Sequence, residues 1–450
     1  MILERRLVTL LLVLGLIAVP AMALRAFCVG NSCESAAERS DPVPFCSLDP
    51  RVRDLVTAGF YEGRSPEALG VTGSTPVVTA AGGGLGVPWP SAQVPRGDAA
   101  KVPLLFLGPG FRTTELSDDL GLDQIAPTLE PLLGLERPFP EVRSGRGIDD
   151  LVVPGARAPL AVVIVWKGVG MPEIRETSTP WFDGVSSVPG STSQPPDGFA
   201  GGLAEPGSLP YDPAAVLATI GSGGLPSDHG VTGTVLRAEH GVARAFGRGA
   251  PSPVIAALGD DLDDTTGGRA RIGLLATDVS DRGLIGGTWY GNEDDDLVVP
   301  AGRTPAARVD RLLDDGWGAD ATPDVLGIVL RGSVSAMDRT TRGIVEAVQA
   351  RIPDAAMVVT ATGSLETTSD TVDAGETLTP AIDAAIATET PIILSAGAGG
   401  LFPDEAVARD AGVSTQQVAD AMRAQTVPGG TGPLFADTFP SFTVRFGRYC

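Results

Sequence analysis

The sequence predicts an α/β fold built on a mainly parallel sheet. Short apolar runs recur along the chain without polar alternation, and such runs are typical of strands buried on both faces of a sheet. Helical stretches lie between the runs, as crossovers between parallel strands require. The chain has 450 residues, with 58 Gly and 38 Pro. It is therefore long enough for a large core, and loops punctuate it densely.

Six runs are predicted to be strands, in the order 102–107, 160–166, 271–276, 325–330, 357–360 and 391–395. Four stretches are predicted to be helices, at 119–135, 306–315, 340–350 and 414–425. The first places Ile125, Leu129, Leu132 and Leu133 on one face, and Ser414 is a good N-cap for the last. The Ser-, Pro- and Gly-rich segment 175–210 is predicted to be a long surface loop or a small insertion.

The N-terminus has the pattern of a secretory signal peptide. A basic start (1–6) precedes an apolar stretch (7–19), and small residues follow in Pro20-Ala21-Met22-Ala23. The apolar stretch is about 13 residues long, whereas a spanning helix needs roughly 20. We expect a signal peptide at 1–23, a leader at 24–44, and a secreted or cell-surface protein. The alternative is an uncleaved membrane anchor, because Leu24 extends the apolar stretch.

Four cysteines, Cys28, Cys33, Cys46 and Cys450, agree with an oxidising destination. We expect two disulfides, Cys28–Cys33 and Cys46–Cys450. The alternatives are free thiols or a metal site, and zinc is poorly supported because neither histidine has a cysteine close to it in sequence.

The net charge of −22 and the pI near 4.4 produce a field that repels nucleic acid and anionic lipid. Aromatic residues make up only 5% of the chain, which is low for a carbohydrate-binding surface. We expect no nucleic-acid partner. A small anion or a cell-surface partner remains open, and contact with a membrane is expected only through an uncleaved N-terminal segment.

Several motifs occur in two blocks. The first block contains AGFYEGRSPEALGV (58–71), VPLLFLGPGF (102–111) and LDQIAPTLEPLLGLERPFPEVRSG (122–145). The second contains LAVVIVWKGVG (160–170), LATIGSGGLPSDHGVTG (217–233), PDVLGIVL (323–330) and AAMVVTATGS (355–364). As a set, these motifs resemble the alkaline phosphatase superfamily, closest to its type I phosphodiesterase and PafA-like phosphatase branch.

The resemblance implies one α/β domain at 45–450, an alkaline-phosphatase-like three-layer sandwich with a mainly parallel sheet and helices on both faces. The order of the blocks is reversed relative to the family. Residues 45–150 match the family's C-terminal part, and residues 160–364 match its N-terminal core. A circular permutation explains this order, and it predicts that strand 102–107 shares a sheet with 160–166 and 325–330. A Cys46–Cys450 bridge would join the two places at which the ancestral, unpermuted chain was continuous. The alternative is that 45–150 form a separate domain.

Members of this superfamily hydrolyse phosphate esters with two metal ions, usually zinc, and a Thr or Ser nucleophile. Their metal shell uses three imidazoles, whereas this chain has only two histidines. Lys167 stands where the first metal-binding Asp is expected, and Pro213 where the nucleophile is expected. Thr362 and Gly363 stand at the Asp-His pair of the ligand motif. The resemblance therefore predicts a degenerate site without catalytic residues, metal or cofactor.

Asp228 and His229 form the one possible residual site. Residues 227–230 spell the ligand motif Ser-Asp-His-Gly, but they follow Gly-Gly-Leu-Pro rather than a buried strand. We interpret His229 as the structural histidine of a turn, with a metal ligand or catalytic base as the alternative. His240 is interpreted as a histidine on a helix face or in a turn. The acidic runs 260–264 and 293–296 are predicted to be solvated loops, with calcium binding as the alternative.

These observations predict an exported, catalytically inactive protein that acts by binding or scaffolding at the cell surface. The alternative is an exported phosphoric ester hydrolase with a rearranged zinc or calcium site that uses Asp228 and His229. A third possibility is an unrelated surface protein whose motifs match by chance.

Overall fold

A computed structural model describes residues 45–73, 77–82, 85–93, 97–117, 119–185, 197–287, 289–290, 295–298, 305–364 and 371–447. The chain divides into two units, Met1–Ser47 and Leu48–Cys450, and the fold below is that of the second. The expected signal peptide and leader lie outside the described residues, as do Cys28, Cys33 and Cys450. Cys46 is disulfide-bonded, and the pairing of the four cysteines stays a prediction. None of the described helices is both long and apolar enough to cross a membrane.

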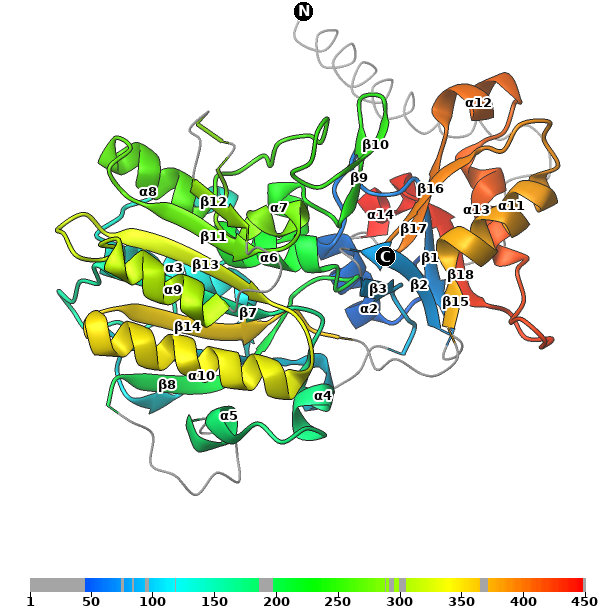
Figure 1. The fold of residues 1–450 in the computed structure, drawn as a ribbon. Coiled ribbons are helices and arrows are strands. Elements are labelled where there is room, and N and C mark those ends of the chain that lie inside the picture. The colour runs from blue at the N-terminus through cyan, green and yellow to red at the C-terminus, as the bar shows by residue number, and fades with distance from the viewer. Residues whose placement is uncertain are drawn as a thin grey trace, which may run out of the picture. The chain divides into compact units, whose positions relative to one another are not determined.

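The unit is built on a mixed, mostly parallel nine-stranded sheet (Figure 1). Its strands are, in spatial order, β12 (Asp295–Val298), β11 (Ile272–Ala276), β13 (Asp324–Leu330), β7 (Leu160–Trp166), β14 (Ala356–Ala361), β4 (Val102–Leu107), β8 (Phe199–Glu205) and β5 (Thr114–Glu115), with β6 (Leu120–Gly121) also paired to β8. The strands from β12 to β14 run parallel, and β4 is antiparallel to both of its neighbours. Every residue of β4, β7, β13 and β14 is buried, which confirms the predicted α/β class.

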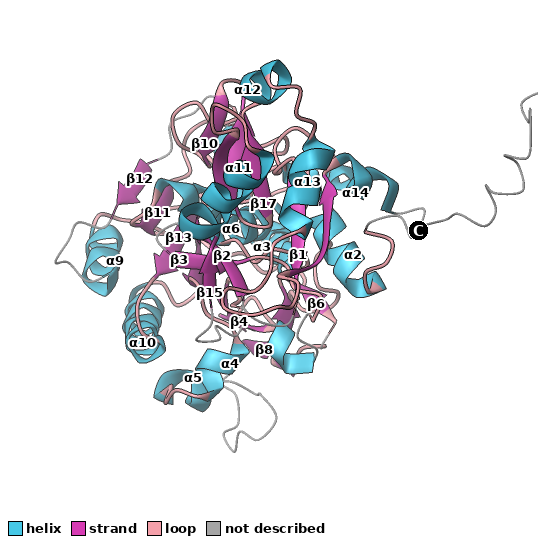
Figure 2. Cartoon of the chain, turned by 90° about the vertical axis from the view of Figure 1, so that its right-hand side faces the viewer, coloured by secondary structure: helices cyan, strands magenta, loops and turns pink. Residues whose placement is uncertain are grey.

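Helices cover both faces of this sheet. Helices α9 (Pro305–Asp314) and α10 (Val334–Arg351) lie on one face, and α3 (Ile125–Leu133) and α6 (Pro213–Ser222) lie on the other (Figures 1 and 2). The Trp166 indole donates a hydrogen bond to Thr341 Oγ1 of α10 (2.8 Å). All four apolar residues expected on one face of the 119–135 stretch are buried, although the helix itself begins only at Ile125.

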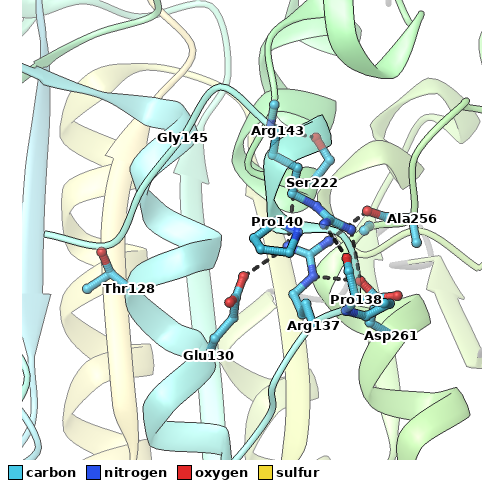
Figure 3. A network of polar contacts seen from close by, with 12 residues as sticks. Thr128, Glu130, Arg137, Pro138, Pro140, Arg143, Gly145, Ser222, Ala256 and Asp261 are labelled. Atoms are coloured by element: carbon cyan, nitrogen blue, oxygen red, sulfur yellow. Dashed lines mark hydrogen bonds and ion pairs between the residues drawn. The ribbon is translucent and has the colours of Figure 1, made fainter.

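The segment before residue 150 contributes directly to this core. Strand β4 lies between β14 and β8, so residues 102–107 share a sheet with 160–166 and 324–330 as predicted. Beyond α3, Arg137 is buried and reaches across to α6 and to α8 (Leu258–Thr266) (Figure 3). Residues 102–145 therefore do not form a separate domain.

A second group of strands packs around its own apolar core. Strands β16 (Ile393–Gly397), β17 (Gly400–Pro403), β1 (Ala68–Thr72) and β18 (Phe435–Pro440) form an antiparallel sheet. Strands β15 (Thr371–Asp373), β2 (Val77–Gly82) and β3 (Leu85–Pro88) form a mixed one, in which β2 is parallel to β15 and antiparallel to β3. Helices α11 (Thr379–Ile386) and α13 (Thr415–Arg423) bury Ile382, Val418 and Met422 in this core. Ser414 caps α13 as predicted, since its hydroxyl accepts from Gln417 N (3.3 Å).

The remaining elements are short. They are α2 (Pro50–Ala58), η1 (Gly97–Ala100), η2 (Leu122–Gln124), η3 (Pro140–Val142), α4 (Met171–Arg175), α5 (Pro180–Val185), α7 (Pro226–His229), the hairpin β9 (Val235–Ala238) and β10 (Gly241–Arg244), η4 (Val279–Leu284), η5 (Ala374–Leu378), α12 (Glu405–Asp410) and α14 (Phe442–Gly447). Helix α14 packs against α2, and Arg445 forms an ion pair with Glu62. The first and last described helices of this unit therefore lie side by side.

Three sequence-based predictions were wrong. The segment 175–210 is not one surface loop, because it contains β8, a strand of the central sheet. Its glycines hide the strand in the sequence and are needed for packing: a Cβ at Gly202 would lie 2.8 Å from Leu116 Cβ. The run 391–395 overlaps a strand as predicted, β16, but this strand is antiparallel and partly exposed instead of being buried in the parallel sheet. The acidic run 260–264 is helical, and Asp260, Asp261 and Asp263 are buried.

Candidate functional site

The carboxyl ends of the parallel strands meet at one edge of the central sheet, where ligands of open α/β sheets bind. Lys167 directly follows β7, and Thr362 and Gly363 follow β14. The turn after β11 leads into η4, which carries Asp278 at its N-cap and Asp281 in its first turn. The topology thus brings residues that are more than a hundred positions apart in sequence to one place.

Lys167 and Asp281 form a buried ion pair at this edge. The Lys167 ammonium contacts Asp281 Oδ1, and both side chains have no solvent exposure. The backbone holds Lys167 in position, because its N–H continues the sheet by donating to the carbonyl of Leu330 on β13 (2.9 Å). Burial raises the pKa of Asp281, while Lys167 opposes that shift.

The second carboxylate oxygen of Asp281 differs from the first in its contacts. Asp281 Oδ2 is buried and has no hydrogen-bond partner among the described residues. A buried charge is costly unless it is paired, so the Lys167 ammonium is what makes an ionised Asp281 tolerable here.

Two further carboxylates act electrostatically on the same ammonium. Asp212 is the N-cap of α6 and accepts from Ala214 N (2.9 Å) and Thr234 Oγ1 (2.8 Å). Burial raises its pKa, and Thr234 and Lys167 oppose the shift. Burial would also raise the pKa of Asp278, but hydrogen bonds from Arg244 and Ser280 lower it to about 2.

The four positions of the predicted degenerate site gather at this edge. Thr362 Oγ1 accepts from Gly168 N (2.8 Å), and Gly363 N donates to the carbonyl of Val169 (2.9 Å), so both residues fasten the end of β14 to the turn after Lys167. Pro213 occupies the first turn of α6, next to Asp212. None of these three residues offers an ionisable group, and the Thr362 hydroxyl is fully buried.

His229 is a neutral structural residue. Its Nδ1 accepts from Val231 N (3.0 Å), so Nε2 carries the proton and donates to Thr219 Oγ1 (3.1 Å). Complete burial, together with the charge of Arg64, lowers its pKa to about 3. Both ring nitrogens are occupied, which agrees with the prediction of a turn histidine.

Asp228 also serves the local backbone. Its Oδ2 accepts from Leu225 N (2.9 Å) and Ser144 N (3.0 Å), which caps α7 and fastens the 144 loop to it. Both ring nitrogens of His229 and the Oδ2 atom of Asp228 are therefore bound to protein groups. Among the described residues, no group of three or more His, Cys, Asp or Glu side chains is arranged to hold a metal ion.

The other residues considered from the sequence lie elsewhere. His240 is exposed on the β9–β10 hairpin. In the 260–264 run, Asp261 pairs with Arg137 and Arg143, and Asp260 accepts from Ala257 N (2.8 Å) and Gly287 N (2.6 Å). The carboxylates of Asp260 and Asp261 are therefore hydrogen-bonded to donors within the protein. Residues 293 and 294, and the side chains of 295 and 296, lie outside what the structure describes.

No family model, curated protein or solved structure matches this chain.

An open cleft of about 520 Å³ lies near the same edge, beyond the ends of β6 and β8. Its polar lining includes Asp123, Ser144, Arg146 and Glu205. Burial raises the pKa of Asp123, and a hydrogen bond from Ser144 opposes the shift. Glu205 pairs with Arg51 (2.9 Å). Sequence reasoning missed this cleft, because its residues come from separate loops and form no motif.

Asp281 was also missed, although it is the partner of the most unusual residue of the site. Its segment, Asp278-Val279-Ser280-Asp281, follows a buried strand. A polar turn after an apolar run was the available signal, because parallel strands place such turns at one edge.

Proposed function

We propose that this chain is a circularly permuted, catalytically inactive relative of the alkaline phosphatase superfamily that is exported and acts by binding. The observation that carries the proposal is the buried Lys167–Asp281 ion pair at the carboxyl edge of the central sheet. Metal-dependent phosphoesterases place cations at this edge to stabilise the charge of the phosphoryl group. Here an ammonium from the chain itself neutralises the carboxylate.

The surroundings of the pair support inactivity. A nucleophile needs a side chain with an attacking atom next to a base or a metal, whereas Pro213 has no such atom and Thr362 is fully buried. The ammonium of Lys167 is enclosed and paired, so it does not face solvent as an anion site would. Asp228 and His229 are engaged with protein groups, which disfavours the rearranged hydrolase.

The topology supports the permutation. Strand β4, from the block that matches the family's C-terminal part, lies next to β14 from the other block. The packing of α14 against α2 brings the ends of the unit together, which is the condition under which permutation is tolerated.

The test is an assay of the purified protein on aryl phosphate monoesters and diesters with zinc, manganese or calcium, together with elemental analysis. We expect no turnover above the uncatalysed rate and no stoichiometric metal. Metal-dependent turnover that Asp228→Asn abolishes, in a variant whose circular dichroism spectrum is unchanged, would establish the rearranged hydrolase instead.

Export is tested separately. We expect the protein in the extracellular or cell-surface fraction, with an N-terminus that begins at residue 24. A protein that stays in the cytoplasm with Met1 intact would disprove this part of the proposal and would leave the question of catalysis open.

A further inference from the structure

Several exposed aromatic and aliphatic side chains take no part in the site above. Among the described residues, seven large apolar side chains are well exposed: Phe139, Val142, Val279, Trp289, Tyr290, Leu394 and Phe442. Four of these, Phe139, Val142, Trp289 and Tyr290, come from two segments that are distant in sequence. We call these four residues the aromatic surface.

Asp261 ties the two segments together. Its Oδ1 accepts from the Tyr290 hydroxyl (2.8 Å), and its Oδ2 accepts from Arg137 Nε (2.6 Å) and Arg143 Nη2 (3.2 Å). Arg143 in turn donates from Nη1 to the carbonyl of Phe139 (3.2 Å). A single buried carboxylate thus connects the segment of Phe139 and Val142 to that of Trp289 and Tyr290.

This support is rigid because its charges are buried and multiply bonded. The side chains of Arg137 and Asp261 are each 1% exposed. The other nitrogens of Arg137 donate to the carbonyls of Ser222 (2.9 Å) and Ala256 (2.7 Å) (Figure 3). A pre-ordered surface loses less entropy on binding than a flexible one.

Phe139 is held in an unusual conformation above this support. Its φ is 53°, in the left-handed region that bulky residues rarely adopt, and its side chain is 68% exposed. Residues in such strained backbone conformations cluster at functional sites. An exposed aromatic ring gains no packing within the chain that would repay this strain.

We propose that the aromatic surface is a docking site for a basic, apolar-containing segment of a protein partner. Exposed apolar clusters mark interaction sites, and Trp and Tyr are enriched among the residues that dominate binding energy. Three exposed carboxylates belong to the same segments or their support: Glu136, Glu141 and Asp264. Arginine and lysine bind both to such carboxylates and over aromatic faces.

Charge selects this occupant over others. Asp264 acts electrostatically on Tyr290: burial, the hydrogen bond to Asp261 and these neighbouring charges raise the pKa of Tyr290 to about 12. Two copies of a chain of net charge −22 repel each other at like-charged surfaces. An anionic membrane repels the chain for the same reason. The inference goes beyond the proposed function, because it uses no residue of the Lys167 site and does not depend on inactivity.

The test is a selection of binders from a displayed library of random 12-residue peptides, using the purified protein, followed by affinity measurements on the selected peptides. Phe139→Ser and Trp289→Ser remove parts of the surface. Phe442→Ser is the matched control, since Phe442 is 56% exposed on α14. Circular dichroism confirms that each variant is folded.

We expect selected peptides that combine Arg or Lys with aromatic or aliphatic residues. Their Kd should rise about tenfold or more in Phe139→Ser and Trp289→Ser, as loss of a central contact predicts, stay unchanged in Phe442→Ser, and rise with salt. The proposal is overturned if no peptide binds, if acidic or uncharged peptides dominate, or if the two variants bind as the wild type does. A dimer that Phe139→Ser dissociates, or zwitterionic vesicle binding that Trp289→Ser removes, would assign the surface to a second copy or to a membrane.

Discussion

Lys167 and Asp281 are each tolerable only in the presence of the other. Removal of one partner leaves an uncompensated charge away from water, which typically costs 3–5 kcal/mol, roughly the penalty seen for other broken buried pairs. We therefore expect Lys167→Met and Asp281→Leu each to lower the free energy of unfolding by about that amount. The double variant should be more stable than either single one. Urea unfolding of the wild type, the two single variants and the double variant measures the interaction energy between Lys167 and Asp281. Additive losses in the double variant would show that the pair does not act as a unit.

His229 makes stability depend on pH. In the folded protein it stays neutral down to about pH 3 because it is buried, whereas in the unfolded chain it titrates near its ordinary value of about 6.5. Below pH 6.5 the unfolded state therefore binds more protons. Through His229, the free energy of unfolding therefore does not change with pH above about 6.5. It falls by about 1.4 kcal/mol per pH unit as the pH drops from 6.5 toward 3.

The comparison that isolates this effect is His229→Gln against the wild type, by urea unfolding between pH 7.5 and 5. His229→Gln should be less stable at pH 7.5, because its hydrogen bonds are disturbed, but the difference should shrink as the pH falls. Exposed His240→Gln is the control and should follow the wild type. A constant difference between His229→Gln and wild type would mean that His229 does not stay neutral in the folded state.

At the scale of elements, Arg137 fastens the segment after α3 to α6 and α8. Its planar guanidinium contacts Glu130, Asp261 and the carbonyls of Ser222 and Ala256 at the same time. Lysine keeps the charge but has a single donor group, so it cannot satisfy that set. We expect Arg137→Lys to lower the free energy of unfolding by about 2–3 kcal/mol, the size of a charged hydrogen bond left unmade.

The control for this element is Arg342→Lys on α10. Arg342 forms an exposed pair with Glu346 (2.8 Å), and such solvent-screened pairs on a helix surface contribute little to stability. If the two substitutions shift the urea midpoint equally, the buried network is not what holds the segment in place.

At the scale of the whole molecule, the packing of α14 against α2 makes a circular permutation of this chain feasible. A chain that begins at Gly155, in an exposed turn, and joins residue 447 to residue 48 through a flexible linker would restore the order of the proposed family. We expect it to fold with the wild-type circular dichroism spectrum. A chain opened inside β7, between Val163 and Ile164, should fail, because it breaks a strand at the centre of the sheet. Failure of the Gly155 chain would remove this support for permutation.

Much of the fold was predictable wherever the structure of a segment is set by residues within that segment. Strands β4, β7, β13 and β14 are buried on both faces, so their sequences are continuously apolar. Ser414 caps α13 through its own hydroxyl, and His229 lies in a turn that begins at Pro226 and ends at Gly230. These features depend on neighbours within a few positions, which the sequence displays directly.

Other features depend on partners far away in the chain. Strand β8 has glycine at position 202 because Leu116 approaches it closely, and that requirement is invisible until the strand is paired. The acidic run at 260–264 is predicted from its sequence to be solvated, because Arg137 and Arg143 come into contact with it only in the folded chain.

The sequence by itself determined the buried α/β class, the strongly acidic charge and the shortage of histidines for a two-zinc shell. Only the tertiary structure decided that Lys167 meets Asp281, that Asp228 and His229 serve a turn, and that Asp261 connects the segment of Phe139 to that of Tyr290. The reason is that local preference acts over a few residues. Charge pairing and surface composition are set by which distant loops the sheet brings to one edge.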